Sequence, residues 1–158
     1  MAISQGDYTS AAPLLKEMID NEPGTNSARE AMLYLGDCYM SDKKPADAAT
    51  WYRKYIGKSG RDQERQRTGH YALGTSLEDA REFRPAAEAY AKAAERSGSV
   101  NDRGRAMLAQ ARCLLRAGQT AQAFDVYKAI VALPGAEVPI VDAANFHLGE
   151  LQAIAQTP

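Results

Sequence analysis

Residues 31–56, AMLYLGDCYM-SDKKP-ADAATWYRKYI, decide the fold of this chain. Apolar residues recur every three or four positions on both sides of the polar break at 41–45, which is the periodicity of a helix with one buried face. Pro45 stands where the second segment begins, a place where its missing N–H costs a helix little. The stretch therefore predicts two amphipathic helices joined by a tight turn, a first helix and a second helix.

The same pair of helices recurs along the chain. The first helices carry a small residue at positions spaced 38, 37 and 38 apart, namely Gly36, Gly74, Ala111 and Gly149. The second helices carry an alanine at spacings of 37, 38 and 37, followed four residues later by a large apolar residue: Ala11 and Leu15, Ala48 and Tyr52, Ala86 and Tyr90, Ala123 and Tyr127. Two residue sets with one period indicate an internal repeat.

The small residues predict close contact between helices. A glycine inside a helix costs about 1 kcal/mol relative to alanine, so we expect the tyrosine or leucine of the partner helix to fill each gap. A helix pair cannot bury its apolar face alone, and stacked pairs share a continuous core. The sequence thus predicts an all-α solenoid of antiparallel helix pairs with roughly eight helices. Its units span about 6–24 (a second helix only), 25–60, 61–98, 99–135 and 139–156 (a terminal helix).

The repeat resembles the tetratricopeptide repeat (TPR) family, which implies a right-handed superhelix. The sequence departs from the family in two ways. Its period exceeds the usual 34 residues by three or four. The family's closing proline is present at Pro23 and near Pro134, but Gly60 and Gly98 stand at the other two junctions. The residues that carry the resemblance are Met32, Leu35, Gly36, Tyr39, Ala48 and Tyr52 in one unit, and Leu73, Gly74, Ala86, Tyr90 and Ala93 in the next.

Both ends of the array are expected to be half-units. The second helix at about 7–20 lacks a first helix, and Met1–Gln5 is too short to form one. Either the chain is a piece of a longer protein or another chain covers the bare face, and we expect the former. A last helix at about 140–155 either caps the array or marks a second cut. We expect Thr25 or Asn26 to cap the helix that follows, and Asp102 to cap a helix at 103–117.

Composition restricts the classes of function. The chain of 158 residues has a net charge of −1, which argues against a broad basic surface for nucleic acid. The sequence contains no run of 18 apolar residues, so it predicts no membrane span, and its N-terminus does not resemble a signal peptide. The compartment stays open between the bacterial periplasm and the cytoplasm.

No motif predicts catalysis or a cofactor. His70 and His147 lie 77 residues apart with no ligand partners at metal-binding spacing, so we expect ordinary helix positions for both. Cys38 and Cys113 fall at equivalent places two units apart, too far for a disulfide, and are expected to be small buried residues. No nucleophile–base pair, phosphate loop or paired carboxylates are present. We predict a non-enzyme without cofactor or metal.

The resemblance implies that the first helices line a concave groove that receives a peptide or protein segment. Arg105, Arg112 and Arg116 share one helical stripe, whereas the earlier units contribute acids, so we expect a groove acidic at one end and basic at the other. The alternative is a solvated face with intramolecular salt bridges. The predicted groove residues are Leu33, Asp37, Met40, Tyr71, Thr75, Glu78, Arg105, Leu108, Arg112, Leu115, Arg116 and Phe146.

Two finer comparisons concern partners. TPR domains that hold chaperone C-terminal tails use Lys and Asn at groove places that here hold Leu33, Asp37, Tyr71 and Thr75, so such tails are not expected ligands. The junction at 23–27 resembles that of bacterial envelope TPR proteins. The leading hypothesis is a protein-interaction scaffold. The alternatives are a self-assembly module that stacks through the ends of the array, and an enzyme or small-ligand binder.

Overall fold

The computed structural model describes the backbone of residues 8–155, and the expectation for Met1–Gln5 lies outside these residues. The described chain is all-helical, as predicted. Its eight helices are α1 (Tyr8–Asn21), α2 (Asn26–Ser41), α3 (Pro45–Lys58), α4 (Gln63–Asp79), α5 (Phe83–Glu95), α6 (Val100–Arg116), α7 (Thr120–Val131) and α8 (Val138–Ala155).

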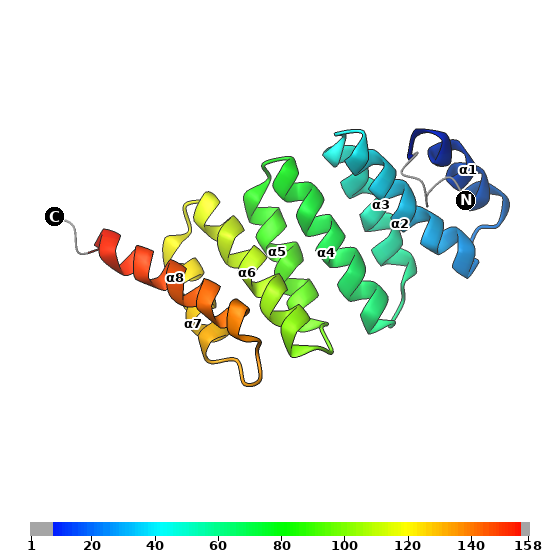
Figure 1. The fold of residues 1–158 in the computed structure, drawn as a ribbon. Helices are drawn as coiled ribbons and strands as arrows, with labels where there is room; N and C mark the ends of the chain where they lie inside the picture. The colour runs from blue at the N-terminus through cyan, green and yellow to red at the C-terminus, as the bar shows by residue number, and fades with distance from the viewer. Residues whose placement is uncertain (1–7, 156–158) are drawn as a thin grey trace.

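The helices stack in one direction (Figure 1). Each helix packs against the next one in the chain, and α6 also packs against α8. The first helices α2, α4, α6 and α8 form one side of the array and α3, α5 and α7 the other. This arrangement is the solenoid of helix pairs that the repeat predicted.

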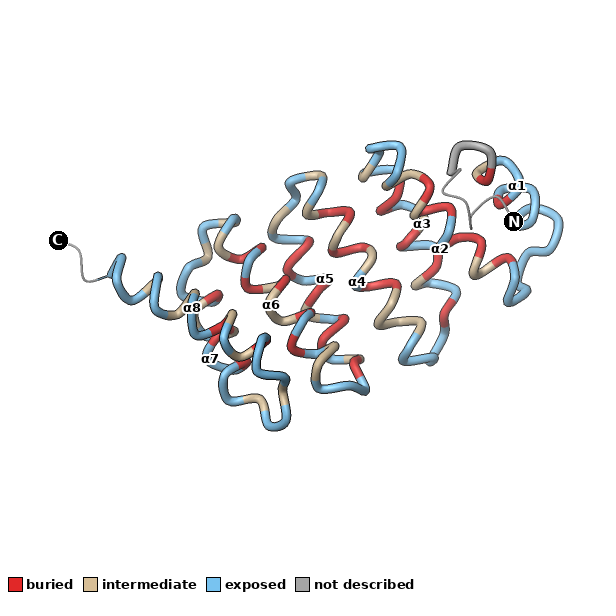
Figure 2. Tube along the Cα trace, in the orientation of Figure 1, coloured by how far each residue is buried: buried red, intermediate tan, exposed pale blue. Residues whose placement is uncertain are grey.

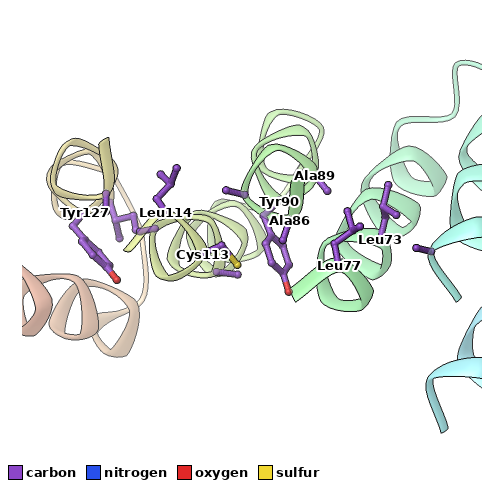
Figure 3. Close-up of a cluster of buried hydrophobic side chains, with 14 of the residues drawn as sticks. Leu73, Leu77, Ala86, Ala89, Tyr90, Cys113, Leu114 and Tyr127 are labelled. Atoms are coloured by element: carbon purple, nitrogen blue, oxygen red, sulfur yellow. The ribbon is translucent and has the colours of Figure 1, made fainter. Parts of the chain in front are cut away.

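Two small residues of the first helices, Gly36 and Gly74, accommodate tyrosine rings as expected, whereas the gap expected to be filled at Gly149 is open. A Cβ added to Gly36 would lie 2.3 Å from the ring of Tyr52, and one added to Gly74 would lie 2.8 Å from the ring of Tyr90. Both rings are 2% exposed. Figure 3 shows Tyr90 and Tyr127 among the buried side chains, with their hydroxyls directed to the same side of the array. Glycine is thus required at 36 and 74 by close approach.

The turn inside each unit repeats a helix-ending motif. Lys43, Arg81 and Gly118 each follow the C-cap with a positive φ of 60°, 62° and 75°. The next residue donates its N–H to a carbonyl five residues back, as in Lys44 to Tyr39 at 2.9 Å and Glu82 to Leu77 at 2.8 Å. This is a Schellman motif, in which glycine is the usual left-handed residue. Two of the three turns use a side-chain-bearing residue instead.

Helix starts differ from expectation at two places, α6 and α8. Ser99, not Asp102, caps α6 by accepting the N–H of Asp102, so α6 begins at Val100 rather than at 103. Asp62 caps α4, which begins at Gln63. Pro139 lies in the first turn of α8 instead of the loop before it, a position that proline tolerates. Thr25 caps α2, one of the two residues expected.

Burial is uneven along the array (Figure 2). Cys38 and Cys113 are buried free thiols, as predicted, and His70 is buried at 8% exposure. In α8, by contrast, the buried residues are Ile140 and Ala144, both in its first half. The second half of α8 is largely exposed, so the middle of the array is well packed and its C-terminal end is open.

Candidate protein-binding face

The predicted groove residues all lie on first helices and therefore on one side of the array. Their apolar members form a broken stripe in which Tyr71 is 38% and Phe146 64% exposed. By helix, the residues are Leu33, Asp37 and Met40 on α2, Tyr71, Thr75 and Glu78 on α4, Arg105, Leu108, Arg112, Leu115 and Arg116 on α6, and Phe146 on α8. Leu33, Met40, Leu108 and Leu115 are half-buried against the core.

We call the space over the small residue of a first helix, such as Gly36 or Gly74, a notch. Two tyrosines that fill notches reach this face with their hydroxyls. The Tyr52 hydroxyl donates to the Asp37 carboxylate at 2.7 Å. The Tyr90 hydroxyl lies 3.1 Å from Glu78 Oε2, to which it donates, and 3.1 Å from the Thr75 hydroxyl. Burial raises the pKa of Asp37, and the Tyr52 hydrogen bond opposes that rise. The tyrosine that fills a notch thus also orients a polar residue of the face.

Glu78 is the most heavily engaged charged residue of the face. The Nε and Nη2 atoms of Arg112 each donate to it at 2.8 Å, and Arg116 Nη1 donates at 3.4 Å. The hydrogen bond from Arg112 is the main reason that the pKa of Glu78 lies below its ordinary value. The side chain of Glu78 is 11% exposed, against 53% for Arg112 and 48% for Arg116. The glutamate is therefore occupied, while both guanidiniums stay half accessible.

The helical stripe of arginines predicted a groove that is acidic at one end and basic at the other. The charges do not separate in this way. Glu30 of α2 pairs with Arg65 of α4 at 3.1 Å, just as Glu78 of α4 pairs with Arg112 of α6. Arg105 lies within 3.5 Å of Asp102 and 3.4 Å of Glu137. Glu30 and Glu78 thus each pair with an arginine of the next first helix, whereas Arg105 pairs within α6 and with the residue before α8. Ion pairs between units cannot be predicted from the pattern of charges along a single helix.

A shallow depression of about 190 Å³ brings Tyr71 and Arg105 together with Arg67, Ser97 and Asp102. The Tyr71 ring is packed edge-on against Tyr90, with centroids 5.2 Å apart. Sequence reasoning missed Arg67, although it precedes Tyr71 by four residues and hence shares its helix face. The depression offers an aromatic surface beside two guanidiniums, a composition common at protein interfaces.

Further depressions lie elsewhere, among them one polar and one apolar. One of about 550 Å³ is bounded by α5, α6 and α7, with polar side chains that include Arg84, Glu88, Gln110 and Gln122. Here Gln110 holds the repeat position of Leu35 and Leu73. The other, about 430 Å³, lies between α1 and α2 and is mostly apolar.

Within 8–155, no group of three or more His, Cys, Asp or Glu side chains is placed to hold a metal ion. No helix in this part of the chain is both long and apolar enough to cross a membrane.

Comparisons with known proteins agree with the repeat architecture. The family model described as Tetratricopeptide repeat matches residues 2–63 and 71–139. No curated protein sequence matches the chain.

Solved structures share the fold at low sequence identity. A protein assigned as a kinesin light chain from Podosopora anserina, with nearly identical TPR-like repeats, superposes with a TM-score of 0.77 at 15% identity, covering 98% of this chain and 82% of that one. A point variant of that protein gives a TM-score of 0.75 at 16% identity over the same shares. The crystal structure of MamA superposes with a TM-score of 0.69 at 18% identity, and the match covers 98% of this chain and 92% of the MamA chain. At such identities the likeness shows the fold alone.

Proposed function

Because the chain belongs to the tetratricopeptide repeat family, we propose that it is a non-catalytic scaffold that binds a peptide or protein segment on the face of its first helices. TPR domains generally serve as protein–protein interaction scaffolds. The supporting observation is the exposed aromatic ring of Tyr71 beside the exposed side chain of Arg105, on a face whose apolar stripe extends to Phe146. Chaperone C-terminal tails are not proposed as ligands, since the Lys and Asn positions that hold them are replaced here.

The residues of this face differ in how far their replacement would disturb the fold. Arg112 and Arg116 are poor choices, because their replacement also strips Glu78 of its partners. Phe146, exposed on α8, and Tyr71 can be shortened with less effect on the core. Val131 on α7, 37% exposed on the opposite side of the array, supplies a matched control.

Peptides selected from a random displayed library against the intact chain provide a defined probe. We expect Tyr71→Ala and Phe146→Ala to weaken the selected peptides about tenfold or more, as for interface anchors. Val131→Ala should leave their affinity within about twofold. Circular dichroism of each variant checks that it is folded. Peptides that respond to Val131→Ala and ignore the other two substitutions would contradict the proposed face.

A second proposed function is self-association through the ends of the array. Among the described residues, six exposed large apolar side chains lie on the helices at the ends (Leu14, Met18, Tyr34, Val138, Phe146 and Ile154), against three on the helices between them. Exposed apolar surface favours association. Sedimentation velocity over a hundredfold concentration range tests this function, and a monomer throughout would exclude it.

A bacterial envelope location stays a prediction from the junction at 23–27. The supporting residues are Pro23, Gly24 and Thr25. Cell fractionation of the source organism would test it directly.

A further inference from the structure

A groove between the second helices α5 and α7 has one altered residue in its lining. The groove is the depression of about 550 Å³ that α5, α6 and α7 bound, and we call it the second-helix groove. Gln110 of α6 lines it, at the repeat position where the other first helices have Leu35, Leu73 and Leu148. Leu35 is 0% and Leu73 8% exposed, whereas Gln110 is half-buried. One unit thus has an amide at this groove where the other units have a leucine.

Five polar side chains of the second-helix groove form neither a hydrogen bond nor an ion pair among residues 8–155, namely Arg84, Glu88, Gln110, Gln122 and Asp125. On the first-helix side, by contrast, Glu30 and Glu78 are both paired with arginines. A half-buried polar group without a partner costs stability, and such local inconsistencies are expected at functional sites. The groove therefore presents polar groups that the described chain leaves available.

The charge of the groove favours a basic ligand. Glu88 of α5 and Asp125 of α7 hold equivalent positions in successive units, 37 residues apart, and both are exposed. Arg84 supplies one positive charge against these two carboxylates. In the unit before, Thr50 holds the position of Glu88, so the pair of acids is not a general feature of the repeat. A lysine or arginine side chain between α5 and α7 would meet both carboxylates in charge-assisted hydrogen bonds.

The amides of the groove favour an extended partner over a helical one. A helix has satisfied its own backbone groups, whereas an extended segment presents N–H and C=O groups that need partners. Gln110 and Gln122 each offer amide donors and a carbonyl acceptor for them. Ala91 of α5 also lines the groove, and its side chain ends at Cβ, so a backbone can come close. The unit before has the long side chain of Arg53 at this position.

We propose that the second-helix groove binds an extended peptide segment that carries a lysine or an arginine. The basic side chain pairs with Glu88 and Asp125, and the peptide backbone forms hydrogen bonds with Gln110 and Gln122. This site is separate from the proposed site on the first helices, because the second helices lie on the other side of the array (Figure 1). The chain can therefore hold one segment on each side.

Random peptides displayed on phage are the probe. They are selected against the double variant Tyr71→Ala, Phe146→Ala, which disfavours peptides for the first helices and leaves the second-helix groove unaltered. We expect the recovered peptides to contain lysine or arginine. Synthetic copies should bind the unaltered chain at least about tenfold more tightly than copies in which the basic residue is alanine.

Three substitutions in the groove and one control locate the site. Glu88→Lys and Asp125→Lys reverse charges at exposed positions and should each weaken these peptides about tenfold or more. Gln110→Leu restores the leucine of the other units, so it should weaken binding to a similar extent while the melting temperature stays equal or rises. Glu17→Lys makes the same charge reversal on the exposed face of α1 and should change the affinity by less than about twofold.

Nuclear magnetic resonance of the isotope-labelled chain reports the contact directly. Addition of a recovered peptide should shift the side-chain amide signals of Gln110 and Gln122, and leave that of Gln152, exposed on α8, in place. A selection that yields no binder, peptides without a basic residue, or affinities that ignore both charge reversals would each overturn the proposal. None of these results bears on the site of the first helices, which is tested with peptides selected against the unaltered chain.

Discussion

Gly74 and Gly149 hold the same place in the repeat and meet opposite surroundings. Over Gly74 lies the ring of Tyr90, 2.8 Å from where a Cβ would stand, while the space over Gly149 is open. The comparison teaches that the residue type alone does not fix its energetic role. At 74 glycine makes a packed contact possible, and at 149 it carries only its cost to the helix. The two regions should therefore respond differently to the same changes.

Removal of a large aromatic ring should separate the regions most strongly. Tyr90→Ala empties a notch in the core, so we expect a loss of about 3–5 kcal/mol in the free energy of unfolding. Phe146→Ala at the open end, where the ring is 64% exposed, should change it by less than about 0.5 kcal/mol. Urea unfolding of both variants measures the difference. Comparable losses would mean that α8 is packed as tightly as the middle of the array.

A single methyl group added to each glycine tests the comparison directly. Gly74→Ala forces the Tyr90 ring to move and should cost about 1–3 kcal/mol. Gly149→Ala meets no neighbour and should stabilise the chain by up to about 1 kcal/mol. Thermal melts at low protein concentration give both values. A loss at 149 equal to that at 74 would show that the open notch is filled in solution.

Acid should weaken the middle of the array through His70. Burial, with Arg96 and Lys92 nearby, lowers the pKa of His70 from 6.5 to about 4. Between these values the unfolded chain binds a proton that the folded chain does not, so stability falls as pH decreases through this window. The expected loss from His70 is about 2 kcal/mol at pH 5 relative to pH 7.

His70→Met is the matched variant, because Met32 holds the same repeat position. Urea unfolding at pH 7 and pH 5 should show a smaller drop for this variant than for the unaltered chain. The exposed counterpart at the open end, Asn145, does not titrate. An identical pH dependence for both proteins would place the acid sensitivity in other groups.

The ion pair between units should have the smallest effect. Glu78→Gln weakens the hydrogen bonds from Arg112 and Arg116, and since both guanidiniums are half exposed, we expect a cost of only about 1 kcal/mol. Glu150→Gln, which alters an exposed contact with His147 at 3.0 Å, should be neutral within about 0.5 kcal/mol. Urea unfolding in low and high salt compares them. Equal effects would argue against a special role for Glu78 between units.

The sequence predicted the helix pairs well because their signal is local. Glycine and tyrosine recur sixteen residues apart, as in Gly36 with Tyr52 and Gly74 with Tyr90, and both pairs are in contact. The start of α6 was wrong because two residues, Ser99 and Asp102, could each cap a helix, and Ser99 provides the hydroxyl that does so. The function of the groove residues stays a prediction.

By itself, the sequence determined the repeat, the all-helical fold and the face on which the groove residues lie, since these depend on period and residue size along one chain. Only the tertiary structure decided which charges neutralise one another. Glu78 and Arg112 lie 34 residues apart, and their pairing depends on how neighbouring units are rotated and spaced. The same holds for Gly149, which shares with Gly74 a preceding leucine and its place in the repeat, and over which no described helix packs.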